Sequence, residues 1–319
     1  MKNKRWILLF YIFMYFVCCG HSFWPLQKRN KNEAKSLFNP RPGSSQKKDI
    51  SRPVKRIFRE EDIVISQDTI WSGKLEIEQV VLVKKGAELT ISPGTELFFS
   101  GPKIESDDVH AIHGGGIKVE GRIHAEGTVD KPIIFSGKNE VPGGWGNIFL
   151  TYSQDNVFTY CIFEYANFAI HAHFSSLNIS NSLFANNNEG CRLGFSQAVI
   201  KNSIFRLNEA RGINFRAGRH EIINNSIVAN RVGIFIYENG NQSKIFSNNI
   251  FNNAEYNLQL GDFHKENVTM SNNYWGKVPD YDKLIHDKND DENIGKVEII
   301  PLIEEEIHWE NEEKVKILR

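Results

Sequence analysis

This chain of 319 residues has few cysteines, methionines and prolines: four Cys, three Met and ten Pro. It also has no large excess of charge of either sign. The net charge of −1 gives no general electrostatic attraction to nucleic acid or to a membrane surface. Beyond the N-terminal region the only cysteines are Cys161 and Cys191, at different phases of the repeat described below, so we expect two buried, unpaired thiols. Hydrophobic residues make up 40% of the chain and Phe occurs 22 times, which is enough for a long packed core.

The first 21 residues are typical of an export signal. The basic stretch "MKNKR" precedes an apolar run from Trp6 to Val17, as in a secretory signal peptide. This run is shorter than the roughly 20 residues of a membrane span, but extended to Trp24 it would serve as an uncleaved anchor. Cys18 and Cys19 resemble a lipoprotein signal in which Cys19 carries the lipid. Secretion, lipidation and anchoring stay open, and all three predict an extracytoplasmic protein that meets a membrane only through this segment.

Residues 22–59 predict a linker and not a domain. The segment is polar and contains "NPRPGSS", and between Leu26 and Arg59 it has 11 Lys or Arg against Glu33 and Asp49. We expect a solvated linker, which could also lie on anionic head groups if the N-terminus is anchored.

A motif that begins with Asn and contains a short apolar run returns about every 22 residues. Its copies are "NSLFANNNEGCRL" from Asn181, "NSIFRLNEARGINF" from Asn202, "NSIVANRVGIFI" from Asn225, "NNIFNNAEYNLQL" from Asn248 and "NNYWG" from Asn272. A fixed period of this size indicates a repeat architecture. The apolar runs are too short to bury a face alone, so we expect a coil in which each rung covers the next and one continuous core forms.

The repeated Asn residues predict two polar ladders inside this coil. Equivalent residues of successive rungs would stack roughly 4.8 Å apart, which is the strand spacing in a sheet. Each side-chain amide would then donate to its neighbour, so that a buried turn satisfies its own hydrogen bonds. The first predicted ladder is Asn181, Asn202, Asn225, Asn248 and Asn272. The second, at another corner, is Asn187, Asn208, Asn230 and Asn253.

This pattern resembles the right-handed parallel β-helix repeat family with the pectin-lyase-like fold, in its bacterial surface or secreted form. "GKLEIEQVVLVKKGAELTISPGTELFF" and "WGNI" are similar to its first rungs, and "NNYWG" is similar to its closing segment. The predicted fold class is therefore an all-β, right-handed, single-stranded parallel β-helix over residues 60–302. Residues 303–319 are expected to cover the last rung, because an open end would expose unpaired strand edges.

Register carried along the strand that follows the Gly position predicts which side chains face outward. The first outward column is His171, Arg192, Asn214, Phe235 and Gln259, and the second is His173, Gly194, Arg216, Tyr237 and Gly261. Glu238 and Asp262 stand where their strands end. In the resembled family this strand belongs to the sheet that carries a saccharide groove.

The residue types in these columns suit a polysaccharide or cell-surface glycan. Arg binds a sugar carboxylate or sulfate through two parallel hydrogen bonds, and aromatic faces stack on sugar rings. We therefore expect a non-catalytic glycan-binding face that uses His171, His173, Arg192, Asn214, Arg216, Phe235, Tyr237 and Gln259. An ordinary solvated sheet, or a structural or protein-binding solenoid, remains the plain alternative.

An enzyme acting on an acidic polysaccharide is the second hypothesis, as a lyase, hydrolase or epimerase. Its candidate catalytic residues are Glu238, Asp262, Arg216 and His173. A hydrolase needs paired carboxylates, and Glu238 and Asp262 lie one rung apart. A calcium-dependent lyase needs a cluster of acids, which the two columns lack. This absence favours binding over catalysis, and we expect no cofactor.

Metal binding is the third hypothesis. "HAH" places His171 and His173 on one strand face, but the next rung offers only Arg192 and Gly194 as neighbours, and a cation beside Arg is unfavourable. Some β-helix proteins that handle copper share such a repeat, yet the repeat alone does not transfer that role. The loop "DKNDDEN", from Asp287 to Asn293, partly matches a calcium loop but lacks the Gly of its sharp turn, so we expect an acidic solvated loop.

Overall fold

The computed structural model describes residues 56–57, 64–100, 114–277, 284–310, 312–316 and 318. The chain divides into two compact units, and all of these residues belong to the unit made of 50–104 and 112–319. The predicted signal segment, Cys19, and the predicted linker apart from Arg56–Ile57 lie outside the described residues.

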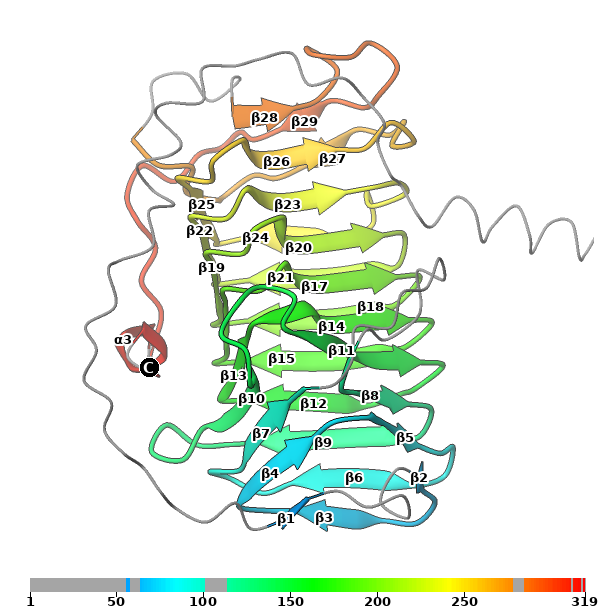
Figure 1. The fold of residues 1–319 in the computed structure, drawn as a ribbon. Coiled ribbons are helices and arrows are strands. Elements are labelled where there is room, and N and C mark those ends of the chain that lie inside the picture. The colour runs from blue at the N-terminus through cyan, green and yellow to red at the C-terminus, as the bar shows by residue number, and fades with distance from the viewer. Residues whose placement is uncertain are drawn as a thin grey trace, which may run out of the picture. The chain divides into compact units, whose positions relative to one another are not determined.

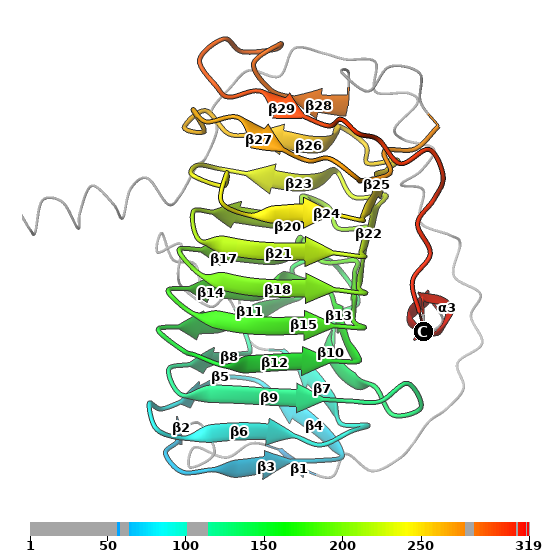
Figure 2. The same cartoon turned by 180° about the vertical axis from the view of Figure 1, so that it is seen from behind.

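The described unit is a coil of three parallel sheets, labelled A, B and C, in which each strand pairs with the third strand before and after it (Figures 1 and 2). Sheet A contains β1 (Arg56–Ile57), β4 (Lys74–Ile77), β7 (Glu96–Phe99), β10 (Ile133–Gly137), β13 (Cys161–Glu164), β16 (Leu183–Ala185), β19 (Ile204–Arg206), β22 (Ser226–Val228) and β25 (Asn249–Phe251). Sheet B contains β2 (Val64–Ile65), β5 (Val80–Val83), β8 (Gly116–Val119), β11 (Trp145–Thr151), β14 (Ala166–His173), β17 (Glu189–Gly194), β20 (Arg211–Arg216), β23 (Val232–Ile236), β26 (Tyr256–Leu260) and β28 (Ile285–His286). Sheet C contains β3 (Thr69–Trp71), β6 (Glu88–Ile91), β9 (Arg122–Glu126), β12 (Asn156–Thr159), β15 (Ser176–Ser180), β18 (Gln197–Lys201), β21 (Arg219–Ile223) and β24 (Lys244–Phe246). The short strands β27 (Val268–Thr269) and β29 (Val297–Glu298) pair beside the last rung, and the helix α3 (Glu312–Lys316) follows.

The predicted fold class, a parallel β-helix, is confirmed. Its turns number about eight, with about 22 residues in each. In sheet A the partners Ile162, Leu183, Ile204, Ser226 and Asn249 show this period directly, since each pairs with the next. The period of the sequence is therefore the length of one turn of the coil.

Inward-facing side chains of neighbouring rungs stack to make one core. Phe135, Phe163, Phe184 and Phe205 form a column of fully buried, nearly parallel rings whose centroids lie 4.7, 4.6 and 4.5 Å apart. Burying each ring stabilises the coil by roughly 2–3 kcal/mol relative to an exposed ring. Cys161 and Cys191 are free and buried in the same core, as expected from their positions in the repeat.

The second predicted Asn ladder is confirmed and extends one residue further. Side-chain amides donate from Asn187 to Asn208, Asn208 to Asn230, Asn230 to Asn253 and Asn253 to Asn257, over 3.0, 2.7, 3.1 and 3.0 Å. Each ladder oxygen also accepts the backbone N–H of the residue before it in the ladder. The corner between sheets A and B is thus buried with the amides of Asn187, Asn208, Asn230 and Asn253 all paired, and Nδ2 of Asn257, at the end of the ladder, has no partner.

The first predicted ladder is wrong by one residue at three of its positions. Asn225 and Asn248 do stack, but their partner is Asn273, and the preceding rungs carry Ser182 and Ser203 in the ladder. The other predicted members, Asn181, Asn202 and Asn272, have φ of 50°, 53° and 58°. They occupy the left-handed corner position just before the ladder, where Asn is better tolerated than most residues.

The C-terminal segment covers a different surface from the one expected. Residues 303–310 and 312–316 do not close the last rung but lie along the outer face of sheet A, and Figures 1 and 2 both show α3 at the height of the middle rungs. Asn249 bonds to the backbone N–H and carbonyl of Ile307 over 2.8 and 2.7 Å. Beyond it, Trp309 and Val315 pack on an outward apolar stripe made of Ile162, Leu183, Ala185 and Ile204. This stripe explains why the segment docks there: four apolar residues face away from the core and need a cover.

None of the helices in the described part of the chain is both long and apolar enough to span a bilayer.

Candidate functional site

The outward columns predicted for sheet B have the predicted register. Pairing aligns Phe149 with His171 and then, rung by rung, Arg192, Asn214, Phe235 and Gln259. The second column aligns His173, Gly194 and Arg216. The sequence therefore identified the correct strands and the correct faces.

The exposure predicted for these columns is wrong for three residues. His171, Asn214 and Phe235 are only 2%, 8% and 8% exposed, although they face away from the core. Long side chains from neighbouring positions cover them: the Phe149 ring lies 4.8 Å from the His171 ring, and the Arg211 guanidinium lies 4.2 Å from the Phe235 ring centre. The face is thus a packed polar and aromatic layer. A ligand would contact the side chains that cover His171, Asn214 and Phe235, and not these three residues themselves.

Glu189, at the start of β17, is the centre of this layer. Its carboxylate accepts two hydrogen bonds from Arg192, both of 2.9 Å, one of 2.7 Å from Arg211 and one of 3.1 Å from the Asn214 amide. Burial by itself raises the pKa of Glu189, but the two guanidinium groups outweigh burial and lower that pKa from 4.5 to about 2. Glu189 is therefore a permanent anion that fixes both arginines in place.

Aromatic rings hold the outer sides of the same arginines. The Arg192 guanidinium lies 4.0 Å from the centre of the Phe168 ring, and Arg211 lies over Phe235 as described above. A guanidinium over a ring face is attracted by the negative charge density of that face. Each arginine is thus oriented by one carboxylate and one ring.

A second ion pair stands at the edge of sheet B where its strands end. Arg216 donates from Nε to Glu238, and the two side chains are 13% and 15% exposed. The Arg216 guanidinium also lies between two rings, 5.1 Å from Phe195 and 5.5 Å from Tyr237. The pair is therefore part of a longer arrangement along this edge.

This arrangement is a continuous line of planar side chains, one from each of six successive rungs. We call it the planar row; it consists of Tyr152, Phe174, Phe195, Arg216, Tyr237 and Phe263. Neighbouring groups are 5.0, 5.3, 5.1, 5.5 and 5.4 Å apart, so the spacing follows the rungs. The row runs past the ends of β11, β14, β17, β20, β23 and β26, which lie one above another in Figure 1.

The two ends of the planar row are its most accessible parts. Tyr152 is 67% exposed and Phe263 is 51% exposed, whereas the four groups between them are half-buried. Tyr152, Phe174 and Phe195 have φ of 52°, 51° and 51°, a left-handed conformation that is strained for bulky side chains. The next rung has Ala217 at the same corner with φ of 52°, so this conformation belongs to the corner and not to the rings.

Sequence reasoning identified Arg216 and Tyr237 but missed Glu189 and the rings of the planar row. A signal for three rings was present: "YS", "FS" and "FS" follow the second outward column at Tyr152, Phe174 and Phe195. Their spacing repeats the rung length. Glu189 precedes Gly190 and lies outside the two predicted outward columns, although it aligns with Arg211 on the next rung.

The four candidate catalytic residues do not form a cluster of free acid and base groups. Glu238 is bonded to Arg216, and Asp262 lies exposed in the turn after β26. The His173 ring lies over Gly194, where an added Cβ would be 2.5 Å from Nε2. The four side chains are thus held by different contacts and are not gathered around one point.

The paired histidines have few groups around them that bind metals. His171 and His173 lie with ring centres 5.2 Å apart and planes at 83°. The neighbouring rungs place Phe149 and Thr151 on one side and Arg192 and Gly194 on the other. Across the described residues, no three His, Cys, Asp or Glu side chains are placed to share a metal ion.

The acidic loop uses its oxygens to hold its own turn. Asp287 accepts backbone N–H groups of Asn289 and Val297 over 2.8 and 2.9 Å. Asp291 accepts the backbone and side-chain N–H groups of Asn293 over 2.9 and 2.8 Å. These bonds give the carboxylates a structural role, which a calcium ion would have to replace.

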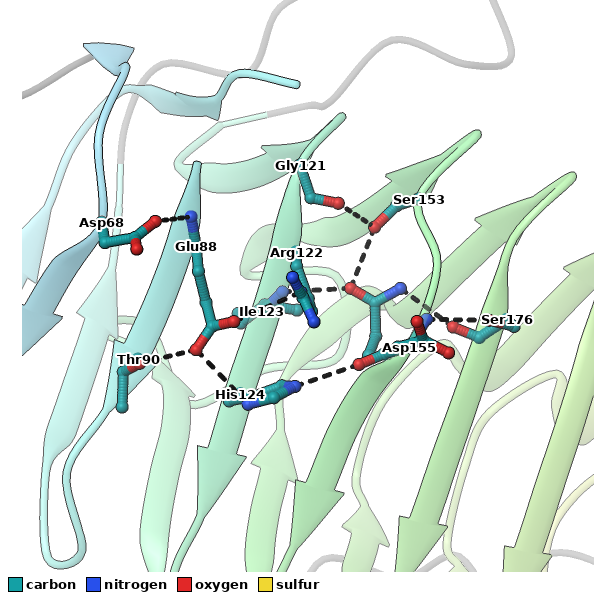
Figure 3. A network of polar contacts seen from close by, with 11 residues as sticks. Asp68, Glu88, Thr90, Gly121, Arg122, Ile123, His124, Ser153, Asp155 and Ser176 are labelled. Carbon is teal, nitrogen blue, oxygen red and sulfur yellow. Dashed lines mark hydrogen bonds and ion pairs between the residues drawn. The ribbon is translucent and has the colours of Figure 1, made fainter. Parts of the chain in front are cut away.

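A further polar cluster joins the early rungs of sheet C (Figure 3). Glu88 on β6 pairs with Arg122 and His124 on β9, over 3.2 and 3.4 Å, and His124 lies 3.1 Å from the Asp155 carbonyl. Beside them, Asn156 accepts from the Ile123 N–H and donates to the Ser176 carbonyl. Each contact links one rung to the next, so this cluster serves the coil in the same way as the Asn ladders.

The three stacked parallel sheets and the packed face of sheet B define a repeat protein of the parallel β-helix class. Within this class, the chain belongs to the NosD family, described as periplasmic copper-binding protein, whose profile matches residues 101–279. The protein is accordingly extracytoplasmic, as expected from its N-terminus. The comparisons found no match among curated proteins and none among solved structures.

Proposed function

We propose that the protein binds a linear glycan along the planar row and does not cleave it. The observation that carries this proposal is the row itself, with six planar groups about 5 Å apart on six successive rungs. An extended sugar chain advances by a similar length with each residue, so a glycan parallel to the coil axis would meet one planar group per sugar.

The chemistry beside the row suits sugar hydroxyl groups. Rings of Tyr152 and Phe263 provide apolar faces for the C–H side of a pyranose. The Arg216–Glu238 pair provides donors and an acceptor in one place, and a hydroxyl group can use both. Gln259 and His173, both half-buried, add further polar groups on the same sheet.

Binding without cleavage is favoured by the state of the carboxylates. Glu189 is buried beneath the arginines, and Glu238 is bonded to Arg216. A glycosidase needs one carboxyl group that carries a proton and one that does not. An acidic-polysaccharide enzyme therefore remains the alternative, and it makes a distinct prediction, namely release of new reducing ends or unsaturated uronates.

Glycan-array screening of the full chain, with product release followed on every hit, tests the proposal. Hits without products would support it. On the best ligand, Tyr152→Ala should weaken binding about five- to tenfold, because the outer face of that ring is lost for stacking, whereas Phe174→Ala should weaken binding less, because the Phe174 ring is stacked between Tyr152 and Phe195 and offers a ligand its edge. Phe246→Ala is the matched control, since Phe246 is an exposed ring on β24 outside the row. Products would assign the site to an enzyme, and an array without hits would leave a structural or protein-binding solenoid.

Copper binding, which the family description names, is not part of the proposal, because the described residues do not fit a copper site. His171 and His173 are flanked by Phe149, Thr151, Arg192 and Gly194, none of which supplies a copper ligand beside an open position. The soft ligands Cys161 and Cys191 face the core, and burial raises the pKa of both thiols well above its usual value. A thiol held neutral in the core is a poor metal ligand.

A further inference from the structure

The arginines Arg192, Arg211 and Arg216 of sheet B are each bonded to a carboxylate of the protein. Arg192 presents Nε and Nη2 to Glu189, and Arg211 presents Nη1 to the same carboxylate. Arg216 presents Nε to Glu238. An arginine binds a carboxylate or sulfate most tightly through two parallel N–H groups, so the Nε–Nη2 edge of Arg192 is occupied, and a ligand anion would compete with Glu189 for Arg211 and with Glu238 for Arg216.

Exchange of these partners for a ligand carboxylate would be unfavourable. Glu189 is 2% exposed, and a uronate that took its place on Arg192 would leave a buried carboxylate without its main partner. Glu238 is 15% exposed beside the planar row, and Asp262 is exposed one turn further on. Both would repel an approaching anion. A hydroxyl group, by contrast, can donate to Glu238 and accept from a guanidinium without displacing either.

We infer that the planar row selects uncharged glycans over polyanionic ones, and that Glu238 determines this specificity by neutralising Arg216 from within the protein. The inference rests on the proposed function, because it names the substrate class of the same site. It also reverses the role that the sequence suggested for the arginines, which were expected to bind sugar carboxylates or sulfates directly.

The test compares neutral and acidic ligands of equal length on the full chain. Calorimetric titration with cellohexaose, mannohexaose and hexagalacturonate should give at least one neutral ligand that binds about tenfold more tightly than hexagalacturonate. Binding of the neutral ligand should not change between low and high salt, because no ion pair forms. Tighter binding of hexagalacturonate by the unaltered chain would overturn the inference.

The variant Glu238→Gln keeps the shape of the side chain and removes its charge. It should strengthen hexagalacturonate binding about three- to tenfold and weaken binding of the neutral ligand, because the amide oxygen of Gln is a weaker acceptor for a hydroxyl group than a carboxylate, so the ratio of the two affinities should shift toward hexagalacturonate. Asp262→Asn, at an exposed position that does not endanger folding, should strengthen hexagalacturonate binding about twofold. The matched control is Glu255→Gln, which breaks the exposed Arg231–Glu255 pair at the other end of the same strands and should change neither affinity.

The possible outcomes distinguish failure of the proposed specificity from failure of the proposed glycan binding. Both variants should have the melting temperature of the unaltered chain. If Glu238→Gln and Asp262→Asn then keep the same ratio of affinities for the neutral ligand and hexagalacturonate, Glu238 is not the determinant of specificity. Failure of all three hexasaccharides to bind, when the array also has no hits, would reject the glycan-binding function and the specificity with it.

Discussion

Asparagine has two distinct roles at the corners of this coil, and they differ by one position. At the ladder position Asn225 is fully buried and bonds to the rungs on both sides. At the preceding position Asn202 adopts a left-handed φ of 53° and contributes through its backbone. The first role needs a side-chain amide, whereas the second needs only a residue that tolerates this conformation.

Replacing one Asn of each kind should separate the two roles. In Asn225→Leu, the Ser203 N–H and the carbonyls of Ile200 and Ile223 lose their partner in a buried corner, which should cost about 3 kcal/mol. Asn202→Gly should change stability by less than about 1 kcal/mol, since Gly adopts a positive φ without strain. Urea denaturation midpoints check both. Equal losses in the two variants would contradict the assigned positions.

His220 should make the coil sensitive to mild acid. Burial lowers the pKa of His220 from 6.5 to about 4, and its Nε2 lies 3.0 Å from the Ala217 carbonyl oxygen. His220 is therefore protonated below pH 6.5 in the unfolded chain, but only below about pH 4 in the folded chain. Stability should fall across this range by up to roughly 1.4 kcal/mol per pH unit for one proton.

His220→Gln provides the check by differential scanning calorimetry between pH 7 and pH 4. In the variant, the free energy of unfolding should fall less steeply with decreasing pH in this interval, by the contribution of about one proton. His264, whose pKa burial also lowers, adds a contribution of the same sign and remains in the variant as an internal reference. Identical slopes in the variant and the unaltered chain would contradict the assignment to His220.

At this scale the sequence predicted residue types better than their surroundings. It identified four members of the second ladder, Asn187, Asn208, Asn230 and Asn253, and missed Asn257, which lies only four residues after Asn253 and so falls outside the repeat. It placed Asn181, Asn202 and Asn272 one position early, because the other corner has two adjacent polar residues and their periodicity is identical. Only the backbone conformation separates the two, and a repeat alone does not reveal it.

In sheet B, a side chain that points away from the core can still be buried by its neighbours. Pattern and register correctly predicted that His171, Asn214 and Phe235 point away from the core. The burial of His171 depends on Phe149, which lies one rung away in the same column, and the burial of Phe235 depends on Arg211, which reaches across from another column. How side chains lie over their neighbours is a property of the folded surface, so the pattern of single strands does not predict it.

The C-terminal segment should be detachable without loss of the rungs. Trp309→Ala removes the largest contact of 303–318 with Ile162, Leu183 and Ile204. We expect faster hydrogen exchange at the Ile307 amide and increased binding of a hydrophobic dye to the uncovered stripe, with strand amides unchanged. Phe263→Ala serves as a control for loss of an exposed ring elsewhere. Exchange that accelerates throughout sheet A would instead show that the segment supports the coil itself.

For the molecule as a whole, the sequence period was sufficient to establish the class of fold. Each rung repeats the same pattern of three strands, and the first rungs follow it before the Asn motif begins. The planar row was not predicted, because its members come from two different columns and a loop. It arises only when six turns are stacked, so it belongs to the assembled surface and to no single repeat.

The pairing pattern has a consequence for how an exported chain reaches its folded state. Between Ile162 and Asn249 every strand of sheet A pairs with the strand one turn earlier in the sequence. A chain that emerges end-first from a secretion channel can therefore complete each turn as soon as that turn has crossed, on a template already finished outside. Trp309 and Val315 come later in the chain than these turns and pack across several of them. Secretion and folding can therefore proceed together from the N-terminus, so that little unfolded chain is exposed to proteases at any time.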